Sequence, residues 1–398
     1  MNHQPELLTV LDSGNQFEMS DHENESYSEE EEITDLSNPT VVLKYKTAAD
    51  IVNKALQGVL SQCTAGKQIS DICAFGDLLI EKQCAEIFKN KDMEKGIAFP
   101  TCVSVNDVVC NYSPFPSDSK TLEAGDVVKV DMGCHIDGYV AMAANTVIIP
   151  SEKMEEARKT EINDLMAAAY LMGEVCQRMI KPGNTNVQVS EALSTICKAY
   201  DVNMLQGILM HQMKRFVIDG NKVILSCNCD TDRVDECTFE PNEVYQVDIA
   251  LTKGDGKTRA IGDRTTVFRR NVEETYLLKT KAARSVLSEI DARFPVFPFS
   301  SRALNDKTAR MGIVECVNHT LLEEYPVIYT RDGSIAVHYK FTVLLVPNGT
   351  DRITGNVIDK AAYPSEKKCE DEKILEVMKF AAMKKKSKKA KKAKKTEA

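Results

Sequence analysis

The sequence predicts an α+β fold built from two similar halves. Helical and strand-like segments occur in blocks and do not alternate strictly, which is typical of α+β proteins. An eleven-residue pattern occurs twice, 117 residues apart. The chain has 398 residues, of which 43% are hydrophobic and 27% charged. That is the balance of a soluble globular protein, long enough for one large domain or two ordinary ones.

The repeated pattern supports the two halves. Residues 122–132 and 239–249 share Leu or Phe, then Glu, and later the run Val-x-x-Val-Asp followed by Met or Ile. Each copy follows helical sequence and precedes a second strand-like run, so each half should place helices on one side of an antiparallel hairpin. Asp131 and Asp248 would then face one shared centre, where two carboxylates can build a metal site. The alternative is that both acids only end strands and begin turns.

The individual elements follow from apolar periodicity. Runs of strand type are rich in Val, Ile and Tyr. The stretch 181–184 (Lys-Pro-Gly-Asn) is a stop signal after the third predicted helix. The predicted helices are 47–63, 70–89, 153–180, 187–200 and 272–292, and the predicted strands are 126–132, 137–149, 243–251, 258–269 and 339–346.

The two ends of the chain carry opposite charge. Residues 1–40 contain eleven acids and no Lys or Arg, whereas residues 384–398 contain nine lysines and one Glu. Both ends are too poor in apolar residues to offset the entropy of ordering. We therefore expect an acidic disordered head at 1–39, a folded domain at 40–379 and a lysine-rich disordered tail at 380–398. The head is interpreted as a solubilising segment or as an electrostatic competitor for the tail.

The tail favours nucleic acid. Lysines that neutralise phosphates release condensed counterions, so contacts should be phosphate-directed, salt-dependent and weakly sequence-specific. Such a tail is also typical of a nuclear or nucleolar localisation signal. The tail candidates are Lys384, Lys385, Lys386, Lys388, Lys389, Lys391, Lys392, Lys394 and Lys395, and weaker candidates on the folded domain are Lys89, Lys91, Lys95, Lys214, Arg215, Arg269 and Arg270.

Membrane insertion and secretion are not expected. No stretch reaches 18 uninterrupted apolar residues, and the first twenty residues carry acids but no Lys or Arg. The 13 cysteines are an odd number without a framework pattern, so we expect reduced thiols in the cytosol or nucleus. Cys227, Cys229 and Cys237 do not match the spacing of a common zinc site.

Several motifs identify a family resemblance. The motifs lie at 42–46, 95–101, 103–106, 112–114, 130–133, 137–139, 211–212, 217–220, 310–312 and 341–345. In these motifs the sequence resembles type 2 methionine aminopeptidases and, more closely, the proliferation-associated, ErbB-receptor-binding protein family. The resemblance covers roughly residues 40–395 and implies the pita-bread fold, two α/β halves around a dinuclear metal site.

The resemblance also implies that the metal site has degenerated. It places Asn111 at the substrate-contacting histidine, Asp131 and Met142 at the two aspartate ligands, Ile208 at the histidine ligand, Phe216 at a second active-site histidine, and Asp248 and Lys340 at the two glutamate ligands. Met142 is a poor ligand for a hard divalent ion. Lys340 would repel a divalent ion by about 8 kcal/mol if about 4 Å away at an effective dielectric near 20. We therefore expect no metal, no cofactor and no catalysis.

Lys340 suggests a specific replacement for the metal. Its ammonium could neutralise Asp131 and Asp248 where the two halves meet. The alternative is that Lys340 points to solvent, where it would have no structural role.

Three classes of function remain open. The resemblance implies a non-catalytic, monomeric protein that binds ribosomal RNA, the large ribosomal subunit or pre-ribosomal particles, regulates growth or translation, and occurs in the cytoplasm, nucleus and nucleolus. A second class is a transcriptional co-repressor or receptor-signalling adaptor. The family's LxxLL-like helix would fall near Ile374, Val377 and Met378, although this apolar stripe could equally pack on the body. An active aminopeptidase is the third class, and an old pocket that only holds an N-terminus is a variant of it.

Overall fold

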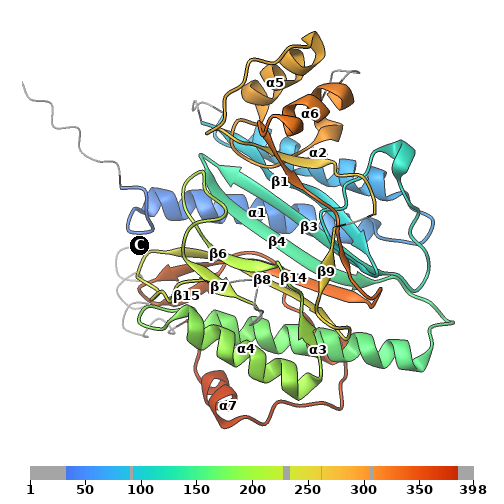
Figure 1. The fold of residues 1–398 in the computed structure, drawn as a ribbon. Coiled ribbons are helices and arrows are strands. Elements are labelled where there is room, and N and C mark those ends of the chain that lie inside the picture. Colours follow the sequence, from blue (N-terminus) through green and yellow to red (C-terminus); the bar gives the residue numbers. More distant parts are fainter. Residues whose placement is uncertain (1–32, 90–92, 227–233, 261, 305–308, 384–398) are drawn as a thin grey trace, which may run out of the picture. The chain divides into compact units, whose positions relative to one another are not determined.

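A nine-stranded antiparallel sheet forms the centre of the molecule (Figure 1). The computed structural model describes residues 33–89, 93–226, 234–260, 262–304 and 309–383. The described residues from Thr34 onward group as one compact unit. Almost all of the predicted head, the nine tail lysines, Lys91, Cys227 and Cys229 lie outside the described residues.

The described helices and strands are bounded as follows. The helices are α1 (Pro39–Gln62), α2 (Ile69–Glu86), α3 (Glu156–Met179), α4 (Asn186–Tyr200), α5 (Lys281–Arg293), α6 (Ala309–Asn318) and α7 (Glu372–Lys379), with 3-10 turns η1 (Pro116–Asp118), η2 (Ser301–Ala303) and η3 (Lys360–Ala362). The longer strands are β1 (Lys95–Val105), β3 (Val127–Ile136), β4 (Tyr139–Ile148), β8 (Val244–Thr252) and β14 (Ala336–Val346). The shorter strands are β2 (Val108–Cys110), β5 (Asn203–Met204), β6 (Leu209–Met213), β7 (Val223–Leu225), β9 (Thr258–Arg259), β10 (Val267–Arg270), β11 (Phe299–Ser300), β12 (Leu322–Tyr325), β13 (Ile328–Thr330) and β15 (Gly349–Arg352).

The strand order shows the two halves. The sheet runs β1-β3-β4-β14-β8-β6-β7, so β4 and β14 meet at its middle. In the first half β3 and β4 form a hairpin that turns at Asp137 and Gly138, both with positive φ. In the second half β8 pairs with β14 along nine residue pairs. Helices α1 and α2 cover β1, β3 and β4, while α3 and α4 cover β8, β14 and β7 (Figure 1). The predicted two-half α+β architecture is therefore present.

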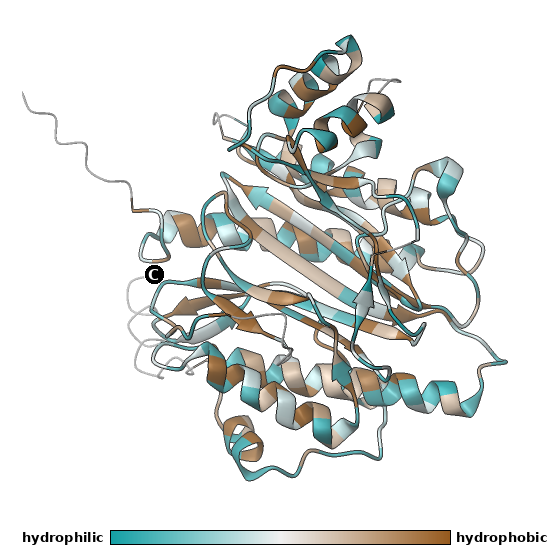
Figure 2. Cartoon of the chain, in the orientation of Figure 1, coloured by the Kyte–Doolittle hydropathy of each residue, from teal (hydrophilic) through white to brown (hydrophobic). Residues whose placement is uncertain are grey.

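Strand alternation decides which residues face the helices. Val130 and Met132 lie in the core under α1 and α2, whereas Val247 and Ile249 lie in the core under α3 and α4. Successive side chains on a strand point to opposite faces. Asp131 and Asp248 therefore lie on the face of the sheet away from these helices. The helices themselves mix hydrophobic and hydrophilic residues, as expected of elements with one buried face (Figure 2).

Two predicted elements and one predicted strand pairing were wrong in part. The predicted strand 258–269 divides into β9 and β10, which belong to different small sheets. Gly262 lies between them, where the backbone passes so close to Tyr329 that a Cβ would lie 2.8 Å from its ring. The hairpin partner of β8 is consequently β14, which is about 90 residues later in the chain, and not the run that follows directly. The predicted helix 272–292 begins only at Lys281, where the Thr280 side chain accepts a hydrogen bond from the Ala283 amide. Strand β1 and helix α6 were not predicted at all.

Ordered contacts also occur just outside residues 40–379. Leu36 is buried in the core and the Asn38 side chain caps α1, so ordered structure begins before residue 40. At the other end, the Phe380 and Ala382 carbonyls accept hydrogen bonds from Arg178 and Thr350. Capping and backbone contacts of this kind have no apolar periodicity, so hydrophobic spacing in the sequence does not indicate them.

Candidate functional site at the centre of the sheet

A row of four residues crosses the middle of the sheet. Asp131 on β3 is paired with Ala144 on β4, Ala144 with Lys340 on β14, and Lys340 with Asp248 on β8. All four share one face, because paired residues on neighbouring strands point the same way. The repeat therefore brings its two aspartates to equivalent strands on either side of the β4–β14 junction, as the sequence predicts.

The side chain of Lys340 joins the two aspartates. Its Nζ lies 2.6 Å from Oδ2 of Asp131 and 3.2 Å from Oδ2 of Asp248. Asp131 is two strands away, about 10 Å at ordinary strand spacing. The contact is possible because Ala144 leaves room above β4 and the four-carbon stem of lysine is long. The expected contact between Lys340 and both carboxylates is present, and the alternative of a solvent-pointing lysine is wrong because Lys340 is 5% exposed.

Asp248 has two further partners. His338 Nε2 lies 2.6 Å from its Oδ1, and the Gln246 side-chain amide donates to its Oδ2 at 3.1 Å. The His338 amide also donates to the Thr146 hydroxyl, which fixes the strand beside the site. His338 was not singled out from the sequence, although its spacing of two from Lys340 places both on one face of a strand.

The charges of this cluster stabilise one another. Burial opposes ionisation of Asp248, but the neighbouring Lys340 and His338 outweigh it and hold the pKa of the carboxyl well below its usual range. Burial likewise disfavours the charged form of Lys340, but Asp131 and Asp248 outweigh it and raise the pKa of the ammonium. Burial raises the pKa of the adjacent Cys110 thiol to about 12, so this thiol stays protonated at neutral pH. The cluster is a buried ion pair of one lysine with two carboxylates.

A dinuclear metal site does not fit these residues. The ammonium of Lys340 already contacts one oxygen of each aspartate. Met142, which the resemblance places at the second aspartate position, packs among apolar side chains that include Phe99 and Val140. Among the described residues, no group of three or more His, Cys, Asp or Glu side chains is arranged to hold a metal ion.

The other predicted site positions are used in packing. Asn111 has a positive φ and its side-chain amide donates to the Pro326 carbonyl at 3.0 Å. Ile208 packs beside Cys110, and the Phe216 ring stacks on Phe297 with centroids 6.1 Å apart. None of these three side chains can act as a general acid or base.

Most of the basic residues that the sequence suggested for nucleic-acid binding on the folded body already have ion-pair or hydrogen-bond partners. Arg215 pairs with Asp137 at 2.7 Å, and Lys95 donates to the Ile87 carbonyl. Arg269 contacts both Asp219 and Glu323, and Arg270 contacts Asp291. Lys89 and Lys214 are exposed. The body candidates therefore do not form a free basic surface like that expected of the tail.

Comparison with known proteins agrees with this architecture. The model of metallopeptidase family M24 matches residues 43–277. The ErbB-3 binding protein 1 of Solanum tuberosum is 47% identical over 345 residues, which cover 86% of this chain and 87% of that protein. The curved DNA-binding protein of Schizosaccharomyces pombe is 38% identical and covers 88% and 94% of the two chains.

Solved structures show the same fold. A thermophilic Arx1 matches with a TM-score of 0.81 at 28% identity over 87% of this chain and 100% of its own. A methionine aminopeptidase of Thermotoga maritima matches with a TM-score of 0.53 at 18% identity over 81% of this chain and all of its own, which shows the fold alone. Two halves around a shared centre define the pita-bread class of protein. This chain belongs to metallopeptidase family M24, in its proliferation-associated and ErbB-3-binding group.

The helices described here give no sign of a membrane span. None of them, within the part of the chain that the structure describes, is both long enough and apolar enough to cross a bilayer.

Proposed function

We propose that this protein is a non-catalytic member of family M24 that binds RNA and the ribosome, in particular ribosomal RNA of the large subunit or pre-ribosomal particles. The observation that supports the loss of catalysis is the Lys340 ammonium, which contacts both remaining acidic positions of the old metal site. Removing one ligand-supporting group typically costs 10–100-fold in metal affinity. Here Met142, Ile208 and Lys340 replace three ligands outright.

The lysine-rich tail supports the choice of RNA. Nine lysines between residues 384 and 395 make a dense polycation, and the name of the Schizosaccharomyces pombe relative attributes DNA binding to that protein. Lysine contacts to phosphate are non-specific and fall steeply with salt. Because the arginine candidates of the folded body are already paired with acidic side chains, the tail is the main source of affinity for RNA. Regulation of growth or translation, and presence in the cytoplasm and nucleolus, would follow from this binding.

Ribosome sedimentation tests this proposal. The full chain should co-sediment with large subunits at low salt and dissociate at high salt. A matched variant with the nine tail lysines changed to glutamine keeps the length of the tail but removes its charge, so it should lose most of the association. An association that the glutamine variant retains would move the contact to the folded body. No association at any salt would reject the proposal.

A second candidate function is an adaptor that binds receptor tails or transcriptional partners. It is favoured by the printed name of the Solanum tuberosum relative, which attributes ErbB-3 binding to that protein. The motif first considered for it is not available for docking, because Ile374 of α7 is 3% exposed and packs against the core under α3, with Met378 beside it. An adaptor role would therefore need another surface. The protein is proposed to act as a monomer in either role.

A further inference from the structure

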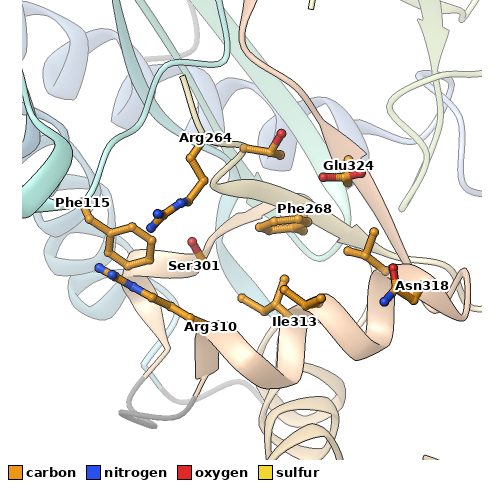
Figure 3. A pocket seen from close by; sticks show the side chains of 11 residues that line it. Phe115, Arg264, Phe268, Ser301, Arg310, Ile313, Asn318 and Glu324 are labelled. Atoms are coloured by element: carbon orange, nitrogen blue, oxygen red, sulfur yellow. The ribbon is translucent and has the colours of Figure 1, made fainter. Parts of the chain in front are cut away.

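A cavity of about 530 Å³ lies outside the central site, between helix α6 and the small sheet of β10, β11 and β12 (Figure 3). Its volume is within the usual range of ligand pockets. We propose that this cavity binds a peptide segment of a partner protein in which an acidic side chain neighbours a large apolar one. This site is independent of the central ion pair and of the lysine tail.

The floor of the cavity is apolar and rigid. Phe268 of β10 and Ile313 of α6 line it, and both are buried in the core that α5 and α6 share, with Val317 packed against them. Val314 also lines the cavity and is 58% exposed, and Met311 on the same helix is 67% exposed. The apolar surface thus continues from the floor onto the outer face of α6. An exposed apolar surface next to a cavity is typical of a protein-binding site.

One end of the cavity is cationic. Arg264, Arg310 and Phe115 gather there (Figure 3). The Arg310 guanidinium lies 4.1 Å from the centroid of the Phe115 ring, which holds it in place. Arg264 contacts Asp118 at 3.3 Å, but this pair is solvent-exposed and therefore weak. A carboxylate from a ligand could contact both guanidiniums, and such charge-assisted hydrogen bonds are strong.

A buried hydroxyl lies at the same end. Ser301 lines the cavity, is 4% exposed, and its Oγ has no hydrogen-bond partner among the described residues. Buried polar atoms are normally paired, and an orphan costs free energy. A carbonyl or carboxylate oxygen of a peptide that enters here would satisfy it. This is a second feature, besides the arginines, that favours an oxygen-rich group at this end.

The opposite end of the cavity disfavours a nucleic acid as the ligand. Glu324 and Asn318 lie there, apart from the arginines (Figure 3). A carboxylate would repel the continuous charge of a nucleic acid, but it can accept a hydrogen bond from a peptide amide. Of the two aromatic rings in the lining, Phe268 is 4% exposed and Phe115 lies under the Arg310 guanidinium, which leaves little aromatic surface on which bases could stack. The cavity therefore fits a peptide with an acidic side chain next to a large apolar one and with free backbone amides.

Methyl NMR on the full chain tests the proposal directly. Isoleucine and valine methyl groups are labelled, and the peptide acetyl-Gly-Glu-Asp-Leu-Phe-Gly-amide is added. Saturable shifts should appear at Ile313, Val314 and Val317, while Val357, equally exposed at 62% but not in the lining, should not move. Peptides with Lys-Lys in place of Glu-Asp, or Ser-Ser in place of Leu-Phe, should not produce these shifts.

Charge-reversal variants test whether the cationic end of the cavity binds the acidic side chain of the peptide. Arg264→Glu and Arg310→Glu should each weaken peptide binding about tenfold or more. Arg331→Glu is a matched control, because Arg331 is 53% exposed and paired like Arg264, and it should bind as wild type does. Absence of shifts with the acidic peptide, or equal binding of the Lys-Lys peptide, would overturn the proposal. Stronger shifts at the same methyls with a ten-nucleotide uridine RNA would assign the cavity to nucleic acid instead.

Discussion

Lys340 and Asp131 form a buried ion pair across an intervening strand, with 2.6 Å between the ammonium and the carboxylate. The two residues come from different halves of the repeat and are 209 positions apart. The pair therefore joins the two halves at the centre of the sheet. The ammonium of Lys340 neutralises the two carboxylates at this centre.

Removing the ammonium should destabilise the fold. Lys340→Met leaves Asp131 and Asp248 buried next to each other without a cation, and breaking a buried pair in this way costs about 3–5 kcal/mol. Urea unfolding followed by circular dichroism measures the loss. Lys120→Met is the control, because Lys120 pairs with Asp263 at an exposed position and should contribute less than about 1 kcal/mol. A Lys340→Met protein as stable as wild type would show that the pair does not hold the halves together.

Divalent metal should not stabilise the wild-type protein. Ligands that bind only the folded state raise the melting temperature, so 1 mM Mn²⁺ against EDTA is a direct test. Wild type should melt at the same temperature in both. Lys340→Glu brings three carboxylates together, so its melting temperature should rise with Mn²⁺. A metal-dependent rise in wild type would contradict the proposed loss of the site.

Lys129 should make stability increase with pH above neutrality. This lysine is 1% exposed and donates to the Asn106 carbonyl at 2.6 Å, and burial lowers the pKa of its ammonium to about 7, although Asp107 and Asp126 oppose the shift. Between pH 7 and the unfolded pKa of 10.5, the unfolded state binds more protons. The free energy of unfolding should therefore rise with pH in this window, by at most about 1.4 kcal/mol per unit.

The Lys129→Met variant isolates this contribution. Urea unfolding at pH 7, 8 and 9 should show a rising difference between wild type and Lys129→Met, since the variant cannot titrate at this position. A difference that stays constant over this range would mean that Lys129 stays fully charged in the folded protein and that its pKa is not lowered.

Helix α7 should depend on one buried contact. Ile374 is 3% exposed, whereas its neighbour Leu375 is 46% exposed. Ile374→Ala should lower the local stability of α7 by about 2 kcal/mol or more, because a buried isoleucine is truncated. Hydrogen exchange of the α7 amides measures this, and Leu375→Ala should leave their protection nearly unchanged. Equal effects of both substitutions would mean that α7 does not dock through Ile374.

The sequence was a good guide to elements with strong periodicity and a poor guide to short ones. Helices α1 to α4 and strands β3, β4, β8 and β14 follow from apolar spacing that tertiary contacts reinforce. Strand β1 was missed because its residues 95–105 contain Gly96 and Pro100, which weaken a strand pattern, and its pairing with β3 has two register shifts. The short strands β9 to β13 exist only through their partners in the small sheets.

The residues of the central site can also be divided into those that the sequence placed and those that only the fold brought together. The repeat determined that Asp131 and Asp248 occupy equivalent places, because a duplicated pattern with a two-residue strand period must place both acids on corresponding faces. The sequence also determined that Met142, Ile208 and Lys340 lack the oxygen or imidazole ligands that a hard metal requires. Only the tertiary structure decided that Lys340 reaches Asp131 over Ala144 and that His338 and Gln246 complete the partners of Asp248. Those contacts depend on the pairing of β14 between β4 and β8, and strands that are far apart in the chain acquire neighbours only when the sheet forms.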